Sequence, residues 1–557
     1  MCIRDSPYTV ESETMTRELF ETCLLLSKRL DKKYNKQTIA AKMTDVPGHT
    51  RSIIDPMYDA GIRLLHVGIN SACPLPSVPT FCRWRSPSGN DLLLVYQKDY
   101  GEDEVLPDGK TVVSINFTGD NHGPHSYERV KKIYADLRKR YPQAQLVGAS
   151  FNDVARELLL IKKDLPVVTS EIGDTWIFGY GGAPIRMAKF RAVSRLYSQW
   201  LNEGKIKKDS DVALDFAAEL GLIAEHTQGV DVKTHLRQWD KYDMDKFLKG
   251  RSEGVFSMAE ASWKEIDNYI DSAIAFLPAS LQKEAREVVA EVDKVKLEDN
   301  SKMKPMARKR WEQPIAGGMI LAGLSYQMFD GDDYDDFQNR YLRARYEWAL
   351  DDLGKRGLKE SHAVSVTLYA QTMAQSVRKE KKGTRIITEL RFPENEKVDK
   401  RVYPERIQVN CFTTKNGKRS EVALTVYGKP TVRLPESYWL SFTVPGIESV
   451  IAEKMGERVD LMDVVEKGNR QMHGIDRYVD LITSGETIRI SSKEAFLLNV
   501  GEAQGLNYST NYPDKHKGVH FNLNNNLWGT NFSMWNEGSL TCLLYTSDAA
   551  DEARSVD

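Results

Sequence analysis

Residues 40–50 read Ala-Ala-Lys-Met-Thr-Asp-Val-Pro-Gly-His-Thr and predict a β-strand that ends in an abrupt turn. The strand breaks here because Pro47 has no backbone donor and Gly48 tolerates a positive φ. Asp45 then lies at the carboxyl end of the strand. In parallel α/β folds that end faces the active site, so Asp45 and His49 are candidates for chemistry. The alternative is a turn in which Asp45 bonds only its own backbone.

The neighbouring segments predict a β-α-β unit around this turn. The strand itself is expected at residues 37–43, after an amphipathic helix at 16–33 whose apolar residues recur at helical spacing. A short helix is expected at 52–60 and a second strand at 63–67. A hairpin-like pair of strands follows at 80–85 and 91–96.

A second carboxylate follows a strand further along the chain. Residues 112–117 alternate apolar and polar side chains and predict a strand, which runs into a turn containing Asp120, Asn121 and His122. Asp120 would therefore lie at the same face as Asp45. The alternative is a tight turn that only caps the helix expected at 127–140, with Ser126 as its N-cap.

The remaining part of this region continues to alternate strands and helices. Strands are expected at 145–150 and 165–170, on either side of a helix at 151–162. The second strand leads into residues 171–176 (Glu-Ile-Gly-Asp-Thr-Trp), which place more polar groups at a strand end. This alternation is typical of a parallel (β/α) barrel.

Two further regions follow the expected barrel. Helical periodicity dominates residues 211–292 and predicts a helical bundle, with His226 near its start. A lone histidine in such a bundle is usually structural. Strand-like segments predominate after residue 311 and predict a large β-sandwich, interrupted by a helix at about 333–355.

Composition excludes several classes of function. The chain has 557 residues, a net charge of −2 and 28% charged residues, without a basic stripe for nucleic acid. No apolar run approaches the roughly 20 residues that span a bilayer. The six cysteines lack a Cys-x-x-Cys pair, which argues against a disulfide scaffold or a thiolate zinc site. Any metal should therefore be held by histidines and carboxylates.

Several motifs, in order, resemble glycoside hydrolase family 38, the α-mannosidases. Residues 45–50 resemble its Asp-Pro-Phe-Gly-His-Ser motif, and Gly119-Asp120 resembles its Gly-Asp-Gly-Gly-Gly-Gly-Pro-Thr segment. His226 matches the histidine of its Gln-Phe-His-Asp motif, with Thr227 in place of the aspartate. The segments 43–50, 171–176 and 527–532 are closer still to an offshoot, the domain of unknown function 5054 family.

The resemblance implies a metal-dependent retaining glycosidase acting on α-mannoside-like carbohydrate. Asp45 would be both nucleophile and zinc ligand, Asp120 the acid/base and His226 a second zinc ligand. Retention needs two carboxyl groups about 5 Å apart, one attacking and one protonating the leaving oxygen. A zinc ion, Zn²⁺, would orient the hydroxyls of the substrate and stabilise charge.

The resemblance also implies a set of residues that contact the carbohydrate. These are His49, Asn121, His122, Glu171, Asp174 and Trp176, the last as a stacking platform or as a core residue. Asn121 and His122 stand where the family has glycines, which changes the shape of the pocket. Three alternatives remain open: a carbohydrate deacetylase, a polysaccharide lyase with a histidine such as His122 as base, and a non-catalytic carbohydrate-binding protein.

The two ends predict a truncated fragment. Residues 1–6 and 542–546 can be read from complementary strands of one DNA sequence, as in a sequencing adapter, so we set aside residues 1–6 and 542–557. The expected domains are a truncated barrel at 7–181, a bundle at 182–310 and a β-sandwich at 311–541. Relatives supply a His-x-Asp pair of metal ligands upstream, so this fragment is expected to bind metal weakly and to have little activity. The sequence leaves both a cytoplasmic and an exported location open.

Overall fold

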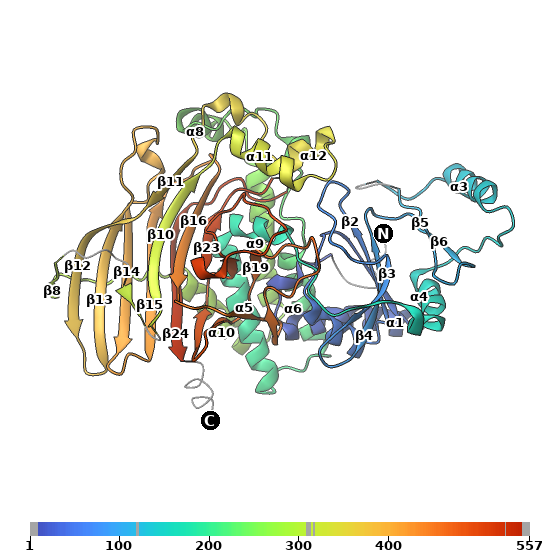
Figure 1. Cartoon of the computed structure of the whole chain (residues 1–557), viewed down its shortest axis with the longest axis horizontal. Coiled ribbons are helices and arrows are strands. Elements are labelled where there is room, and N and C mark those ends of the chain that lie inside the picture. The colour runs from blue at the N-terminus through green and yellow to red at the C-terminus, as the bar shows by residue number, and fades with distance from the viewer. Residues whose placement is uncertain (1–8, 119–121, 308–312, 316–317, 530, 549–557) are drawn as a thin grey trace.

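The computed structural model describes residues 9–118, 122–307, 313–315, 318–529 and 531–548. A small α/β region lies at one end of the molecule and two large sheets lie at the other, with long helices between and below them (Figure 1). The predicted Asp120 and Asn121 fall outside the described residues. The mixed α/β and β-rich organisation expected from the sequence is confirmed.

The α/β region is built on a five-stranded sheet with the order β1-β2-β4-β3-β7. Its strands are β1 (Ala40–Asp45), β2 (Leu64–Ile69), β3 (Phe81–Arg85), β4 (Asp91–Gln97) and β7 (Val167–Val168). The strands β1, β2 and β4 are parallel, and β3 runs antiparallel to β4. The predicted β-α-β unit and hairpin are confirmed, although β1 begins and ends later than the expected 37–43.

The sheet is open where a barrel was expected. The predicted strand at 112–117 is reduced to β6 (Val112–Ser114), which pairs only with β5 (Asp103–Val105) in a separate two-stranded sheet. Residues 145–150 form no strand, and Val147 is 70% exposed. Alternation in a short segment gives a strand only where a neighbouring strand and a core face are available; β6 has both, since it pairs with β5 and Val113 is buried, but residues 145–150 have neither.

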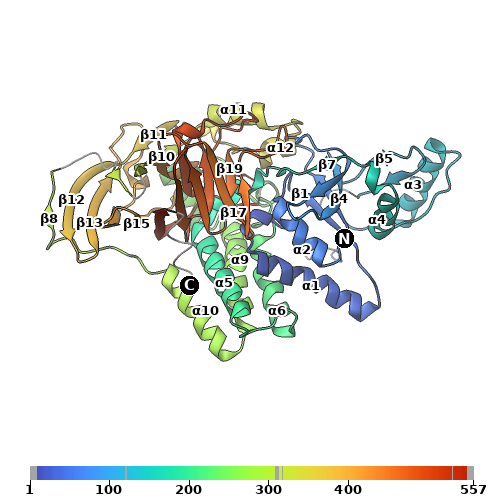
Figure 2. The same ribbon diagram turned by 60° about the horizontal axis from the view of Figure 1, so that its bottom comes forward.

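Long helices pack beside the sheet and beneath the β-rich region (Figure 2). The helix α1 (Arg17–Tyr34) packs on α5 (Pro184–Asn202) and α6 (Asp211–Leu220), and α6 packs on α9 (Ser257–Ala275). The other α-helices of the described residues are α2 (Ile54–Asp59), α3 (Tyr127–Arg140), α4 (Phe151–Leu160), α7 (Val232–His235), α8 (Met244–Ser252), α10 (Ala279–Val292), α11 (Gly331–Tyr341) and α12 (Glu347–Asp352). Ser126 caps α3 as expected, because its Oγ accepts a bond of 3.2 Å from the backbone of Arg129.

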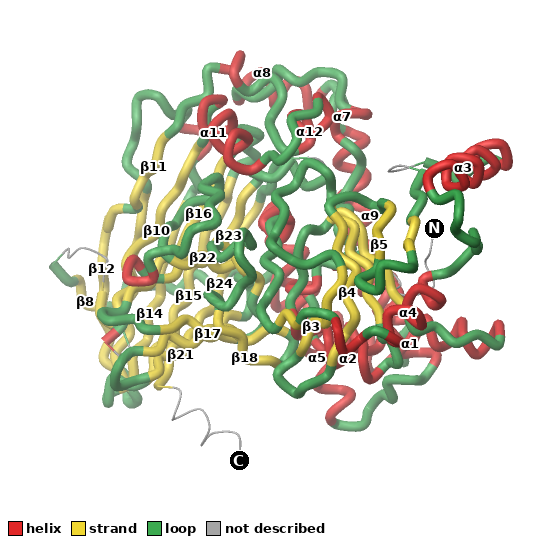
Figure 3. Tube along the Cα trace, turned by 45° about the vertical axis from the view of Figure 1, so that its right-hand side comes forward, coloured by secondary structure: helices red, strands yellow, loops and turns green. Residues whose placement is uncertain are grey.

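The second half of the chain forms two large sheets (Figure 3). The seven-stranded sheet contains β9 (Gln313–Pro314), β10 (Ile320–Met328), β11 (Val366–Tyr369), β16 (Glu436–Thr443), β19 (Met472–Gly474), β22 (Leu497–Val500) and β23 (Val519–Asn525). The ten-stranded sheet contains β8 (Lys304–Pro305), β12 (Gln371–Lys379), β13 (Gly383–Arg391), β14 (Arg406–Thr414), β15 (Arg419–Lys429), β17 (Ser449–Lys454), β18 (Glu457–Asp460), β20 (Tyr478–Ile482), β21 (Thr487–Ser492) and β24 (Gly538–Asp548).

The strand β24 includes residues 542–548, which are expected from the sequence to be an adapter-like end outside the fold. Residues 542–548 complete it, pairing with β15 on one side and β21 on the other. Cys542 and Leu544 are buried there. An apolar, β-prone stretch such as Leu-Thr-Cys-Leu-Leu-Tyr-Thr fits a central strand whatever its origin. Among the described residues, no helix is long and apolar enough to cross a membrane.

Candidate active site

Asp45 ends β1 in a conformation that turns the chain sharply. Its φ of +74° lies in the left-handed region, which aspartate tolerates better than most residues. Gly48 does not need a positive φ here. Instead, a Cβ at this position would lie 2.1 Å from the carbonyl oxygen of Ile172, so only glycine allows the turn to pack against residues 172–173. The turn thereby fixes Asp45 against a distant segment.

His226 meets the Asp45 carboxylate, as the sequence predicted for a shared site. Its Nε2 lies 3.0 Å from Oδ2 of Asp45, although the two residues are 181 positions apart. The backbone of His226 donates to the carbonyl of Thr9 at 3.0 Å, and Val10 bridges to Glu225. The segment before α1 therefore holds the histidine over the carboxyl end of β1.

Two further donors bind the other oxygen of Asp45. The Tyr100 hydroxyl and the Asn70 side-chain amide, the latter at 3.1 Å, both donate to Oδ1. Burial raises the pKa of Asp45, but the hydrogen bond and charge of His226 and the bonds from Tyr100 and Asn70 outweigh it, so the pKa is lower than usual. Asp45 is therefore an ionised, oriented carboxylate at neutral pH.

A second carboxylate lies next to the other ring nitrogen of His226. Oε1 of Glu225 lies 2.6 Å from Nδ1 of His226. Burial lowers the pKa of His226, yet the charge of Glu225 and the bonds to Asp45 and Glu225 raise it well above its usual value. The result is an imidazolium between two carboxylates.

Trp176 packs against this imidazolium rather than facing solvent. Its ring centroid lies 5.7 Å from that of His226, and the residue is 4% exposed. The indole nitrogen donates to Cys73 Sγ at 3.1 Å. Asp174 accepts from the Trp176 backbone at 3.0 Å. Trp176 thus packs on His226 and Asp174 holds the backbone of Trp176, and the burial of both residues leaves little surface for a sugar.

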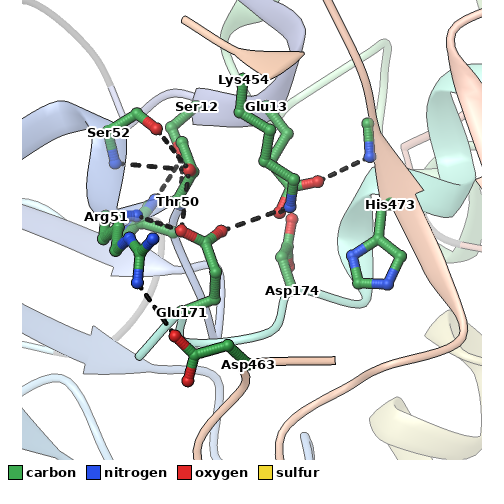
Figure 4. Close-up of polar contacts among 12 residues, drawn as sticks. Ser12, Glu13, Thr50, Arg51, Ser52, Glu171, Asp174, Lys454, Asp463 and His473 are labelled. Carbon is green, nitrogen blue, oxygen red and sulfur yellow. Dashed lines mark hydrogen bonds and ion pairs between the residues drawn. The ribbon is translucent and has the colours of Figure 1, made fainter. Parts of the chain in front are cut away.

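Glu171 belongs to a different network, which joins the α/β region to the β-rich region (Figure 4). Its Oε1 accepts from the Thr50 hydroxyl at 3.1 Å and the Arg51 backbone at 2.8 Å. Its Oε2 lies 3.2 Å from Nζ of Lys454, which also binds Glu13 at 2.8 Å. Both oxygens of Glu171 are thus bonded within the protein.

His49 belongs to the turn that follows β1, and it is 1% exposed. Its Nδ1 is 3.5 Å from the Ser12 hydroxyl, and its Nε2 has no partner among the described residues. Burial and the charge of His226 lower the pKa of His49 to about 3. His49 is therefore neutral and serves the packing of the turn.

A buried pair of carboxyl groups adjoins Trp176. Glu11 is fully buried, and burial and the charge of Asp174 raise its pKa well above the usual value. Burial also raises the pKa of Asp174, so both carboxyl groups are harder to ionise than usual. This pair was not expected from the sequence.

The second predicted catalytic motif is only partly described. His122 is exposed, and Asp120 and Asn121 lie outside the described residues. Phe117, which precedes them, packs with its ring centroid 5.3 Å from that of Tyr100. The chain leading to Asp120 thus passes beside the tyrosine that binds Asp45.

The described residues do not complete a metal site. Asp45 and His226 offer two donors, and the part of the chain described here contains no group of three or more His, Cys, Asp or Glu side chains arranged around a metal. Zinc in proteins generally has four ligands, or three plus water. The donor set present therefore does not fit zinc by itself.

Sequence reasoning missed Tyr100 and Asn70, although a signal for one was available. Asn70 directly follows β2, and its backbone donates to the carbonyl of Asp45 at 2.9 Å. The carboxyl ends of parallel strands meet at one edge, so the rule that selected Asp45 also applies to Asn70. Tyr100 lies three residues beyond β4, where no motif identifies it.

Comparisons with known proteins agree with this architecture. The family model for the domain of unknown function 5054 matches residues 181–315. No curated protein sequence matches the chain. Among solved structures, an α-mannosidase from Enterococcus faecalis V583 is similar at a TM-score of 0.57 and 10% identity, covering 99% of this chain and 79% of that one.

A second solved structure gives the same result. It is a protein of glycosyl hydrolase family 38 from Enterococcus faecalis, with a TM-score of 0.50, 10% identity and coverage of 99% of this chain and 78% of that one. At this identity the likeness concerns the fold alone. The suspected resemblance is confirmed at that level: the chain is similar in fold to glycoside hydrolase family 38 proteins and, over residues 181–315, similar in sequence to the 5054 family.

Proposed function

We propose that this chain is a retaining glycoside hydrolase acting on α-mannoside-like carbohydrate. The observation that carries the proposal is the 3.0 Å contact between Asp45 and His226 at the carboxyl end of β1. It joins two motifs 181 residues apart, in a fold similar to that of family 38 proteins. Both motifs can be identified from the amino-acid sequence alone.

In this proposal Asp45 attacks the anomeric carbon. The carboxylate is ionised, and donors on both oxygens fix its orientation, which favours attack along one direction. The bond from the anomeric carbon to the leaving oxygen breaks as the bond to Asp45 forms. Water then cleaves the glycosyl–enzyme ester, and the configuration is retained.

Asp120 is the proposed acid/base, giving a proton to the leaving oxygen and later taking one from water. The packing of Phe117 on Tyr100 supports this role, because it brings the chain before Asp120 beside the nucleophile. His122 and Asn121 would contact the sugar from the same loop. Trp176, Asp174, His49 and Glu171 would act indirectly, by positioning His226 and the turn after β1.

In this proposal Asp45 and His226 would be two of the ligands of a zinc ion. Those two side chains would need further donors, and no step of the mechanism above depends on the ion. The residues of this chain supply an oriented carboxylate and a charged imidazole without it. Metal dependence is therefore a separate question from nucleophile identity.

Trapping the covalent intermediate tests the proposal. The full chain is incubated with a 5-fluoro mannosyl fluoride, whose fluorine slows hydrolysis of the ester, and the labelled peptide is mapped by mass spectrometry. We expect the label on Asp45 and none on Asp45→Asn. A label on another carboxylate would refute the assignment of the nucleophile.

Product analysis separates the alternatives. Candidate polysaccharides and aryl glycosides are incubated with the chain, and free sugar, acetate and unsaturated uronate are each measured. Free sugar with retained configuration supports the proposal. Acetate identifies a deacetylase, unsaturated uronate identifies a lyase, and binding without any product identifies a carbohydrate-binding protein.

A further inference from the structure

A cavity lies apart from the Asp45 site, where the helical region meets the β-rich region. It is lined by Val232, Lys233, Trp239, Tyr242, Asp351, Asp352, Gly354, Lys355, Arg433, Trp528, Gly529, Phe532 and Met534. None of these residues contacts Asp45 or His226 in the bonds described above. The cavity therefore needs an explanation of its own.

The charges around the cavity are unbalanced toward positive. Lys233 pairs with Asp352 at 2.8 Å, and Asp351 pairs with Arg356 at 3.1 Å. Both acidic groups of the lining are thus already matched with cations. The remaining two cations of the lining, Lys355 and Arg433, are not matched in this way.

Arg433 and Lys355 bond only to backbone carbonyls within the described residues. Arg433 is 3% exposed and donates to the carbonyls of Trp239 and Lys241, at 3.3 and 2.8 Å. Lys355 donates to the carbonyl of Trp528 at 3.2 Å. Burial and the charge of Arg433 lower the pKa of Lys355 to about 7. Lys355 is partly buried, and a fully buried cation such as Arg433, which has the face of the Tyr242 ring beside its two carbonyls, is costly unless an anion joins it.

The same cavity contains a donor without an acceptor. Trp528 is 5% exposed, and its buried indole nitrogen has no hydrogen-bond partner among the described residues. Buried donors are nearly always satisfied in folded proteins, so an orphan indicates a missing partner. An acceptor placed in the cavity would satisfy this group.

The size of the cavity limits the ligand. The cavity has a volume of about 20 Å³, and a single water needs about 10–15 Å³. A whole sugar ring does not fit. The cavity has room for the equivalent of one or two waters, so only one or two oxygens of a ligand can enter it, and their charge should be negative to match Lys355 and Arg433.

We propose that the cavity lined by Lys355, Arg433 and Trp528 binds one oxyanion, either a free inorganic anion or the carboxylate of an acidic sugar whose ring stays outside. The two cations provide charge-assisted bonds, and the indole N–H adds a neutral donor. The aromatic rings of Trp239 and Tyr242 line the same cavity. This site does not depend on the proposed glycosidase activity.

Direct binding measurements test the site. Isothermal titration calorimetry is run on the full chain with sulfate, inorganic phosphate, D-glucuronate and D-glucose, at constant ionic strength in chloride. We expect saturable 1:1 binding of at least one anion and none of glucose. Binding of sulfate or phosphate alone identifies a free anion, whereas binding of glucuronate identifies the acidic sugar. Binding of glucose as tight as that of glucuronate, or no anion binding, would overturn the proposal.

Three variants locate the binding. Lys355→Met and Arg433→Gln should each weaken anion binding at least about 10-fold, and Trp528→Phe should weaken it by a few-fold while keeping the packing of the ring. Lys359→Gln is the matched control, because Lys359 is exposed and pairs with Asp335. If Arg433→Gln does not fold, the anion affinities of Trp528→Phe and Lys355→Met test the site. Unchanged affinity in both would place the anion elsewhere and refute the site.

Discussion

Asp45 and Glu171 are both buried carboxylates in motifs singled out from the sequence, yet their surroundings differ. Asp45 is bound by an imidazole, a phenol and an amide at the edge of the α/β sheet. Glu171 is bound by a lysine, a hydroxyl and a backbone amide in the contact between the two regions. One carboxylate is bonded to Tyr100, whose ring packs on Phe117, and the other is enclosed by partners from both regions.

The difference shows which feature separates the proposed nucleophile from a carboxylate that links two regions. Burial does not, because Asp45 is 9% exposed and Glu171 is 2% exposed. The partners do: Lys454 lies between Glu171 and Glu13 and connects regions far apart in the chain. Removing Asp45 should therefore affect chemistry, and removing the Lys454 network should affect stability.

The largest expected effect is on turnover in Asp45→Asn. The substitution keeps the shape of the side chain but removes the nucleophile, so kcat should fall by about 10⁴-fold, the scale on which single members of catalytic units act. Activity is measured on an aryl α-mannoside, and circular dichroism confirms the fold. Glu171→Gln is the matched control and should retain kcat in its folded fraction. An equal loss of kcat in both variants would contradict the prediction that Asp45, and not Glu171, takes part in the chemistry.

Lys454→Met should destabilise the protein strongly. It leaves Glu13 and Glu171 buried without their shared cation, which costs about 3–5 kcal/mol by comparison with other broken buried ion pairs. Urea denaturation followed by tryptophan fluorescence measures the free energy of unfolding. Lys359→Met, on the surface, controls for the loss of a lysine. A change below about 1 kcal/mol for Lys454→Met would show that the network is not structural.

The same network should make stability depend on pH through Glu13. Burial raises the pKa of Glu13 from 4.5 to about 7, against the opposing effect of Lys454. Between these values the folded state binds more protons than the unfolded state, so stability should fall as pH rises from 4.5 to 7, by up to about 3 kcal/mol. Glu13→Gln should remove this slope. An identical slope in both proteins, measured by urea denaturation, would contradict the assignment.

His122→Ala should have the smallest effect on stability. The side chain is exposed, so the free energy of unfolding should change by less than about 0.5 kcal/mol. In a glycosidase the substitution should mainly raise KM, because His122 would contact the sugar without taking part in bond cleavage. Steady-state kinetics measure this split. Complete loss of kcat would favour the lyase alternative, in which this histidine is the base.

Local motifs predicted the Asp45 site better than the sheet that carries it. Asp45 and His226 were identified because a strand end and a short motif each point to chemistry. The strand at 145–150 was wrong because its apolar residues meet no neighbouring strand, a fact that only tertiary packing determines. Glu11 and Tyr100 were missed for the same reason, since their roles come from neighbours distant in sequence.

The bond between Glu171 and Lys454 spans 283 residues and sets an order of events during synthesis. At about 5–20 residues per second, a ribosome adds Lys454 about 14–60 s after Glu171. Throughout that interval Glu171 lacks its cation, and the turn after Asp45 lacks one of its supports. The bonds of Asp45 to Asn70, Tyr100 and His226 need only the first 226 residues, whereas the Glu171 network must wait for the β-rich half.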